Sequence, residues 1–226
     1  MNEALDFTEL ESKLGYTFKD KSLLKLALTH SSYSNELKIN KTGNYERLEF
    51  LGDAVLELMS SKFFYNEYPE MNEGQLTRLR SSMVCEQALA VCARDIDLPK
   101  YIYLGKGEEN TGGRNRDSII SDVFEAVLGA IFLDGGFEVA DQFVVKNVLT
   151  DLENKQLFYD AKTILQEKIQ KEGNTLSYVV VSESGPDHDK VFVVNAMVGK
   201  EVIGTGTGKS KKQAEQQAAY LYLTKK

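Results

Sequence analysis

Residues 118–133 read SIISDVFEAVLGAIFL, and as a helix this stretch would be apolar on nearly every side. Its polar side chains are Ser118, Ser121, Asp122 and Glu125. A helix of this kind belongs in the middle of a domain, surrounded by other helices. It is too short, and too interrupted by acidic residues, to cross a bilayer. We therefore expect a domain of helices assembled around residues 118–133.

Two carboxylates within this apolar helix need compensation. Asp122 and Glu125 are three residues apart, so they lie on one face of the helix. A carboxylate buried there without a partner would be costly or would stay protonated. Either basic side chains or a bound cation must therefore neutralise the pair.

A second segment supplies further acidic side chains at helical spacing. Residues 45–60 read YERLEFLGDAVLELMS, with one apolar stripe made of Leu48, Leu51, Val55, Leu58 and Met59. Three acidic residues of this segment, Glu46, Glu49 and Asp53, fall together on a neighbouring face at i, i+3 and i+7. If this helix packs against residues 118–133, four carboxylates can converge.

The four converging carboxylates would be Glu49, Asp53, Asp122 and Glu125. Oxygen donors without a fixed positive partner suit a hard divalent ion such as Mg²⁺. Acidic residues at this spacing are also common on solvated helix faces, and spacing alone leaves that alternative open. For Glu46, a place in the first turn of the helix, where an acid stabilises the dipole, is an equal alternative to direct catalysis.

Charge is divided unevenly along the 226 residues, whose formal net charge is −7. Residues 1–159 hold 17 Lys and Arg against 26 Asp and Glu, whereas residues 160–226 hold 10 against 8. This asymmetry indicates two domains with different roles. Cys85 and Cys92 lie seven residues apart in a helical pattern, which favours buried reduced thiols. The first residues show no secretory signal pattern, so we expect a cytoplasmic protein.

The first part of the chain predicts helices throughout. We expect helices over 7–14, 21–30, 45–66, 137–153 and one that Asn72 caps and that opens near Glu73, continuing past residue 89. Residues 31–44 and 103–117 are rich in polar residues and glycine and are predicted to be loops, with Asp117 capping the apolar helix.

The last part of the chain has a different pattern of apolar residues. A helix over 161–173 is followed by three apolar, glycine-punctuated runs at 176–184, 190–199 and 200–208, which read as strands, and then by a final helix. The order α-β-β-β-α within 160–226 predicts a small α+β domain.

Residues 204–210, GTGTGKS, invite comparison with a phosphate-binding loop. That motif would need glycine at 203, where the chain has Ile203, and too few residues follow for a strand carrying a second magnesium ligand. We therefore expect no nucleotide cofactor.

Three lysines stand where a helix disfavours them. Ser210 and Gln213 predict a capping box, so the basic residues Lys209, Lys211 and Lys212 crowd the positive end of the helix dipole. Helix-end N–H groups together with three ammonium groups would bind phosphate. A surface that only aids solubility is the alternative.

Both halves resemble known families. ERLEFLGDAVL (46–56) and RDSIISDVFEAVLGAIFLD (116–134) closely resemble the motifs of the ribonuclease III family, and residues 160–226 look like a double-stranded RNA-binding domain. The resemblance implies an all-α endonuclease domain over 1–153, a linker over 154–159 and an α+β RNA-binding domain over 160–226.

For the first domain, the resemblance implies a homodimeric endonuclease that cuts double-stranded RNA and leaves 5′-phosphate and 3′-hydroxyl ends. Ribosomal RNA precursors and other structured transcripts are the implied substrates. Glu49, Asp53, Asp122 and Glu125 would hold Mg²⁺, for which Mn²⁺ can substitute, with Asp53 and Glu125 catalytic. Glu73 resembles an acid beside the family's catalytic valley. Phe50 resembles an aromatic residue of the subunit interface, although core packing explains it nearly as well.

For the second domain, the resemblance implies recognition of A-form shape rather than sequence. Gln166 and Glu167 would contact one minor groove and His188 the next, with the three lysines on the phosphates between them. Without the resemblance, His188 would be read as a solvent-exposed turn residue. The rival function is a non-catalytic protein that binds double-stranded RNA. Loss of the four carboxylates would mark such a protein, and the sequence retains all four.

Overall fold

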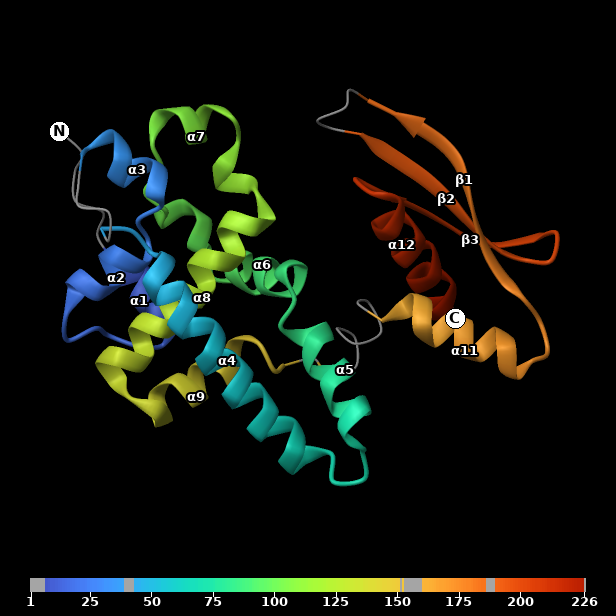
Figure 1. Ribbon diagram of the computed structural model, residues 1–226, viewed down its shortest axis with the longest axis horizontal. Helices are drawn as coiled ribbons and strands as arrows, with labels where there is room; N and C mark the ends of the chain where they lie inside the picture. Colours follow the sequence, from blue (N-terminus) through green and yellow to red (C-terminus); the bar gives the residue numbers. More distant parts are fainter. Residues whose placement is uncertain (1–6, 39–42, 151, 153–159, 186–189, 226) are drawn as a thin grey trace. The chain divides into compact units, whose positions relative to one another are not determined.

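The structure is a computed structural model, and it describes residues 7–38, 43–150, 152, 160–185 and 190–225. The chain forms two compact units, Met1–Thr150 and Asp151–Lys226 (Figure 1). The expected linker over 154–159 lies outside the described residues.

The first unit is helical, as predicted. Its helices are α1 (Thr8–Leu14), α2 (Lys21–Ala27), α3 (Ser31–Glu36), α4 (Glu46–Glu67), α5 (Glu73–Met83), α6 (Glu86–Asp95), α7 (Lys106–Asn110), α8 (Asp117–Gly135) and α9 (Phe137–Asn147), with short 3₁₀ turns at Leu98–Tyr101 and Gly113–Asn115. Within the part of the chain that the structure describes, no helix has the length and hydrophobicity needed to cross a membrane.

Helix α8 is the central element of this unit. Every residue from Ile119 to Ile131 is buried except Asp122 and Glu125. Helices α2, α4, α6 and α9 all pack against it, and Figure 1 shows it in the middle of the first unit. The predicted buried helix is therefore confirmed, with its two acidic side chains on the least covered face.

Helices α4 and α8 cross in direct backbone contact. A Cβ atom placed on Gly52 of α4 would lie 1.8 Å from the carbonyl oxygen of Glu125. A Cβ atom on Gly129 of α8 would lie 2.3 Å from the carbonyl oxygen of Leu48. Both distances are far below van der Waals contact, so only glycine at both positions permits this approach.

Three sequence-based predictions about loops and helix starts were wrong. Residues 31–36, predicted to be loop, form α3, because the Nδ1 atom of His30 accepts the N–H of Ser32 at 3.1 Å and caps the helix. Residues 106–110, also predicted to be loop, form α7. The predicted cap Asp117 is instead the first residue of α8, with Arg116 at the capping position.

The single helix expected from Glu73 onward is broken at Val84 and Cys85 into α5 and α6. On one straight helix, Met83 and Leu89 would point about 120° apart. The break lets both side chains be fully buried. Asn72 caps the start of α5 as predicted, and the structure adds a capping box with Gln75. Helix α9 ends at Asn147 rather than 153.

The second unit has the predicted α-β-β-β-α order. It comprises α11 (Ala161–Lys171), β1 (Leu176–Ser184), β2 (Val191–Val198), β3 (Glu201–Gly208) and α12 (Lys211–Thr224). The strands form an antiparallel sheet in the order β1-β2-β3. Its core joins the two helices to the sheet through Ala161, Leu165, Ile169, Leu176, Ala196, Ala218 and Ala219.

The glycines of GTGTGKS have a packing role in this unit. A Cβ atom on Gly206 would lie 2.3 Å from both the carbonyl oxygen of Ala214 and the amide nitrogen of Ala218. Gly204 and Gly208 approach the same helix almost as closely. Alternate residues of β3 face α12, because side chains of a strand alternate between its two sides. The glycines therefore let α12 lie directly on β3.

The α4–α8 contact gives a sharp stability test. Gly52→Ala forces a methyl group into the Glu125 carbonyl, so we expect a loss of about 3 kcal/mol or more in the free energy of unfolding. Gly74→Ala in α5 is the matched control, because its nearest neighbour would be Asn72 Oδ1 at 3.6 Å. That variant should gain up to about 1 kcal/mol. Denaturant unfolding of both variants measures the difference, and equal stabilities would refute the close contact.

Candidate active site

The crossing of α4 and α8 brings four carboxylates into electrostatic contact. Glu49 and Asp53 flank Gly52 on α4, and Asp122 and Glu125 lie on the exposed side of α8. The pKa of Glu125 is raised by burial first and then by the charges of Asp53, Asp122 and Glu49. We call these four residues the carboxylate cluster.

Burial and mutual repulsion shift the ionisation of this cluster. The pKa of Glu125 is raised to about 8 and that of Glu49 to about 7, in both cases chiefly because the side chain is partly buried. Burial also raises the pKa of Asp122. Asp53 is exposed. These acids are therefore costly to ionise together in the protein alone.

Within the described residues no basic side chain forms an ion pair with the cluster, although the charge of His30 lowers the pKa of Asp122 against the larger effect of burial. Arg116, which precedes α8, lies with its Nη1 atom 2.7 Å from Glu108 Oε1 instead. Among the ion pairs of the described residues, none includes a member of the carboxylate cluster. The negative charge is left for a bound cation to neutralise.

The donor set fits a hard divalent cation, although its side chains do not form a coordination shell as they stand. Across the described ranges, no three His, Cys, Asp or Glu side chains are placed so that they could hold a metal ion. The chemistry still fits, because the donors are all oxygen, lie close enough to raise each other's pKa and form no ion pair in the described part of the chain.

Tyr45 is a neighbour of the cluster that sequence reasoning missed. Its hydroxyl donates to Asp122 Oδ2 at 3.3 Å, and its side chain is buried. Burial, followed by the charges of Asp122 and Glu49, raises the pKa of Tyr45 well above its usual range. The ring lies against that of His30, with centroids 5.7 Å apart. The sequence does carry one signal for this role, because Tyr45 is an aromatic residue directly before the acidic amphipathic helix.

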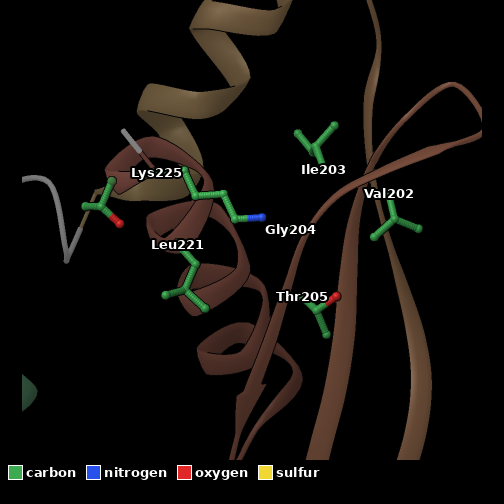
Figure 2. A pocket seen from close by; sticks show the side chains of 7 residues that line it. Val202, Ile203, Gly204, Thr205, Leu221 and Lys225 are labelled. Atoms are coloured by element: carbon green, nitrogen blue, oxygen red, sulfur yellow. The ribbon is translucent and has the colours of Figure 1, made fainter.

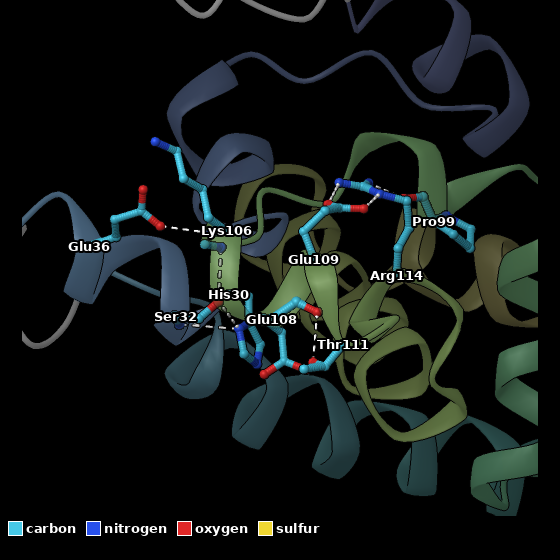
Figure 3. Close-up of polar contacts among 10 residues, drawn as sticks. His30, Ser32, Glu36, Pro99, Lys106, Glu108, Glu109, Thr111 and Arg114 are labelled. Atoms are coloured by element: carbon cyan, nitrogen blue, oxygen red, sulfur yellow. Dashed lines mark hydrogen bonds and ion pairs between the residues drawn. The ribbon is translucent and has the colours of Figure 1, made fainter. Parts of the chain in front are cut away.

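Helices α3 and α7 form a polar layer beside His30 (Figure 3). The Oγ atom of Ser32 lies 2.7 Å from His30 Nδ1 and accepts the N–H of Gly105 at 3.0 Å. The N–H of Lys106 donates to Glu36 Oε2 at 2.7 Å. These contacts fix the loop that carries His30. Burial lowers the pKa of His30, and the charge of Glu108 opposes that shift.

The remaining candidate residues of the first unit are Glu46, Glu73 and Phe50, and all three are exposed. Glu46 is exposed in the first turn of α4, and its charge contributes to the raised pKa of Glu49. Glu73 is exposed at the start of α5, where it accepts the hydroxyl of Thr77 at 3.1 Å. Phe50 is 81% exposed, which excludes the core-packing alternative.

In the second unit the three lysines are exposed around the start of α12. Lys211 Nζ lies 5.9 Å from the centre of the Phe192 ring. Ser210 caps the helix by accepting the N–H of Gln213 at 3.2 Å, as predicted. The Gln213 side chain accepts the N–H of Lys209 at 3.0 Å rather than that of Ser210, so the capping box is displaced by one residue.

The other RNA-binding candidates divide between described and undescribed segments. Gln166 is half-buried and Glu167 exposed on α11. His188 lies outside the described residues. Phe192 pairs with Gly208, and Val191 with Ser184. The start of α12 therefore lies at the same end of the sheet as the connection between β1 and β2.

A hollow of about 510 Å³ lies in the second unit rather than at the carboxylate cluster. Figure 2 shows it between β3 and the last turns of α12, lined by Val202, Ile203, Gly204, Thr205, Leu221, Thr224 and Lys225. Only Lys225 among these carries a charge, so the lining lacks the paired acid–base or metal-binding groups that hydrolysis needs. The carboxylate cluster remains the candidate site.

Comparison with protein families identifies both units. The model described as "Ribonuclease-III-like" matches residues 20–152, more than half of the chain. The chain belongs to the ribonuclease III family. The model of the "Double-stranded RNA binding motif" matches residues 161–226, so the second unit is a double-stranded RNA-binding domain.

Relatives in this family span nearly the whole chain. A "Ribonuclease 3" of Pelotomaculum thermopropionicum is 48% identical, covering 100% of this chain and 95% of that protein. A "Ribonuclease 3" of Natranaerobius thermophilus is 47% identical, covering 99% and 97%. A solved nuclease domain of Campylobacter jejuni ribonuclease III has a TM-score of 0.58 and 42% identity, covering 63% of this chain and 98% of that one.

The raised pKa of Glu125 predicts how stability changes with pH in metal-free protein. Its pKa rises from 4.5 to about 8 on folding, so between these values the folded state holds a proton that the unfolded state has lost. Stability should therefore fall as pH rises through this window. Glu125→Gln cannot ionise, so at pH 8 it should melt about 2–4 °C above the wild type.

Melting curves in a chelator between pH 5 and pH 8.5 measure this difference. If Glu125 were instead stabilised by a basic partner, Glu125→Gln would strand that partner and melt below the wild type at pH 8. That result would contradict an uncompensated cluster.

Proposed function

We propose that this member of the ribonuclease III family is an endoribonuclease that hydrolyses phosphodiester bonds in double-stranded RNA, leaving 5′-phosphate and 3′-hydroxyl ends. The observation that carries the proposal is the uncompensated carboxylate cluster at the α4–α8 crossing. The same chain supplies a double-stranded RNA-binding domain. A site for hydrolysis and a domain for its substrate are thus joined in one protein.

Membership of the family implies dependence on a divalent metal. We propose Mg²⁺ as that metal, with Mn²⁺ able to substitute, and Glu49, Asp53, Asp122 and Glu125 as the residues that would hold it. When bound, such an ion makes water a nucleophile at neutral pH and screens charge on the scissile phosphate.

The arrangement of the cluster makes RNA cleavage depend on that cation. Bare carboxylates repel the phosphates of a duplex, so a scissile phosphate can approach only after the cluster's charge is neutralised. Asp53 is exposed and would therefore face the substrate, whereas Glu125 is half-buried. We propose these two as the catalytic residues, with Glu46 and Glu73 as accessory acids. The surface position of Glu73 on α5 suits contact with RNA more than with the cluster.

The second unit would hold the duplex by its shape. The exposed Lys209, Lys211 and Lys212 stand beside the N–H groups at the start of α12. Together they would bind phosphates across the major groove. We propose that Gln166, Glu167 and His188 contact the flanking minor grooves.

We propose that the nuclease domain forms a homodimer through α4. Phe50 is 81% exposed and Leu58, two turns along the same helix, is 57% exposed. For the Campylobacter jejuni nuclease domain, structural flexibility is described in a region involved in dimer formation. Sedimentation of the full chain tests the proposal, and a monomer at micromolar concentration would contradict it.

Cleavage of a long RNA duplex tests the function. The full chain should cut it with Mg²⁺, should leave it intact in a chelator, and should ignore the corresponding single strands. Labelled products should carry 5′-phosphates. Glu125→Gln should bind the duplex as the wild type does but cleave it about 10²-fold slower or worse, because charge stabilisation in the transition state is lost. Binding without cleavage by the wild type would favour the non-catalytic alternative.

The lysines at the start of α12 give a test of RNA binding. Each phosphate contact contributes about 0.9 to the slope of log affinity against log salt, so Lys211→Ala with Lys212→Ala should lower that slope by about 2. Lys200→Ala is the control, because Lys200 lies between β2 and β3 at the opposite end of the sheet. Filter-binding titrations over a range of salt measure the slopes. An unchanged slope in the double variant would make these lysines ordinary surface residues.

A further inference from the structure

Tyr45 is held in place from its backbone to its ring. Its backbone N–H donates to the carbonyl oxygen of Thr29 at 2.9 Å, at the point where the chain enters α4. Its side chain is only 4% exposed, and its ring lies against His30 with centroids 5.7 Å apart. The hydroxyl therefore has little freedom to move.

The segment behind Tyr45 is itself anchored. Thr29 forms a parallel bridge with Tyr103, and the N–H of His30 donates to the carbonyl oxygen of Tyr103 at 3.1 Å. Ser32 in turn holds both His30 and Gly105 (Figure 3). The Tyr45 ring thus rests on a chain of contacts that joins three segments of the first unit.

The hydroxyl group of Tyr45 forms a hydrogen bond with Asp122. It donates to Oδ2 at 3.3 Å, from outside the α4–α8 crossing. This donor restrains one carboxylate oxygen of Asp122. Burial raises the pKa of Asp122. The hydrogen bond from Tyr45 is the largest of the contributions that lower this pKa, ahead of those of His30 and Ser121. Groups that orient metal ligands in this way commonly tune affinity for the metal.

We propose that Tyr45 is a positioning residue, whose hydroxyl orients Asp122 within the carboxylate cluster and so sets the protein's affinity for its divalent cation. This inference rests on the proposed function, because it assigns the cluster to a cation. It adds a residue that contacts neither the cation nor the RNA.

Tyr16 provides a matched comparison within the same unit. Its hydroxyl donates to Asp134 Oδ2 at 2.7 Å, and Asp134 also accepts the backbone N–H groups of Lys19 and Asp20 at 2.7 and 3.1 Å. That arrangement ties α8 to a loop and lies apart from the carboxylate cluster. Tyr16→Phe therefore removes a tyrosine–aspartate hydrogen bond that serves structure alone.

The test uses full-length wild type, Tyr45→Phe and Tyr16→Phe. Mn²⁺ binding without RNA is measured by calorimetry, the Mg²⁺ midpoint by single-turnover cleavage of a duplex, and stability by melting in a chelator. Tyr45→Phe should bind Mn²⁺ about threefold to tenfold more weakly and raise the Mg²⁺ midpoint by a similar factor. Its rate at saturating Mg²⁺ should change less than its midpoint. Tyr16→Phe should lower the melting temperature and leave both metal readouts unchanged.

Two outcomes would overturn the inference. If Tyr45→Phe matches the wild type in Mn²⁺ binding and Mg²⁺ midpoint, the hydroxyl does not position Asp122. If Tyr16→Phe shifts the metal readouts as much as Tyr45→Phe, the effect is general loss of stability. Failure of the proposed function is distinct, because the wild type itself would then neither bind Mn²⁺ nor cleave, and the inference would fall with it.

Discussion

The rest of this structure depends on the direct backbone contact between α4 and α8. Gly52 and Gly129 allow the two helices to approach so closely that a single methyl group on either would collide with a carbonyl oxygen. This approach places Glu49 and Asp53 within electrostatic reach of Asp122 and Glu125. Larger residues at the crossing would hold the helices apart, and the four carboxylates would no longer act as one cluster.

The carboxylate cluster lowers the stability of the isolated protein when its acidic side chains are ionised. Burial and repulsion raise the pKa values of Glu49 and Glu125, which means that the folded chain resists the charge that the cluster needs. The proposed cation would reverse this balance, because it would supply a positive partner where no ion pair involves the cluster in the described ranges. The polar layer of α3 and α7 supports the cluster indirectly. It fixes His30, and the ring of His30 contacts Tyr45.

The second unit uses the same packing device for another purpose. Glycines on β3 let α12 lie directly on the sheet, with Ala214 and Ala218 fully buried against them. This contact fixes the start of α12, where Ser210 caps the helix and the lysines are exposed. In both units, close glycine-mediated packing thus presents charged side chains: the acids of the proposed cation site in the first, and the lysines of the proposed phosphate contacts in the second.

The sequence by itself determined the α-helical first domain, the α-β-β-β-α second domain and the candidate carboxylates, because apolar periodicity and residue spacing are local properties of the chain. It missed α3, because the capping residue His30 is not one of the usual N-cap types. It could not divide α5 from α6, since the simultaneous burial of Met83 and Leu89 depends on neighbours distant in sequence. The spacing of residues 204–210 excluded a phosphate-binding loop, but only the structure showed that these glycines contact α12. Only the tertiary structure decided that Phe50 is exposed, that Arg116 contacts Glu108, and that Tyr45 reaches Asp122. The Tyr45–Asp122 contact depends on how closely α4 and α8 cross, and that distance is set by the absence of side chains at Gly52 and Gly129.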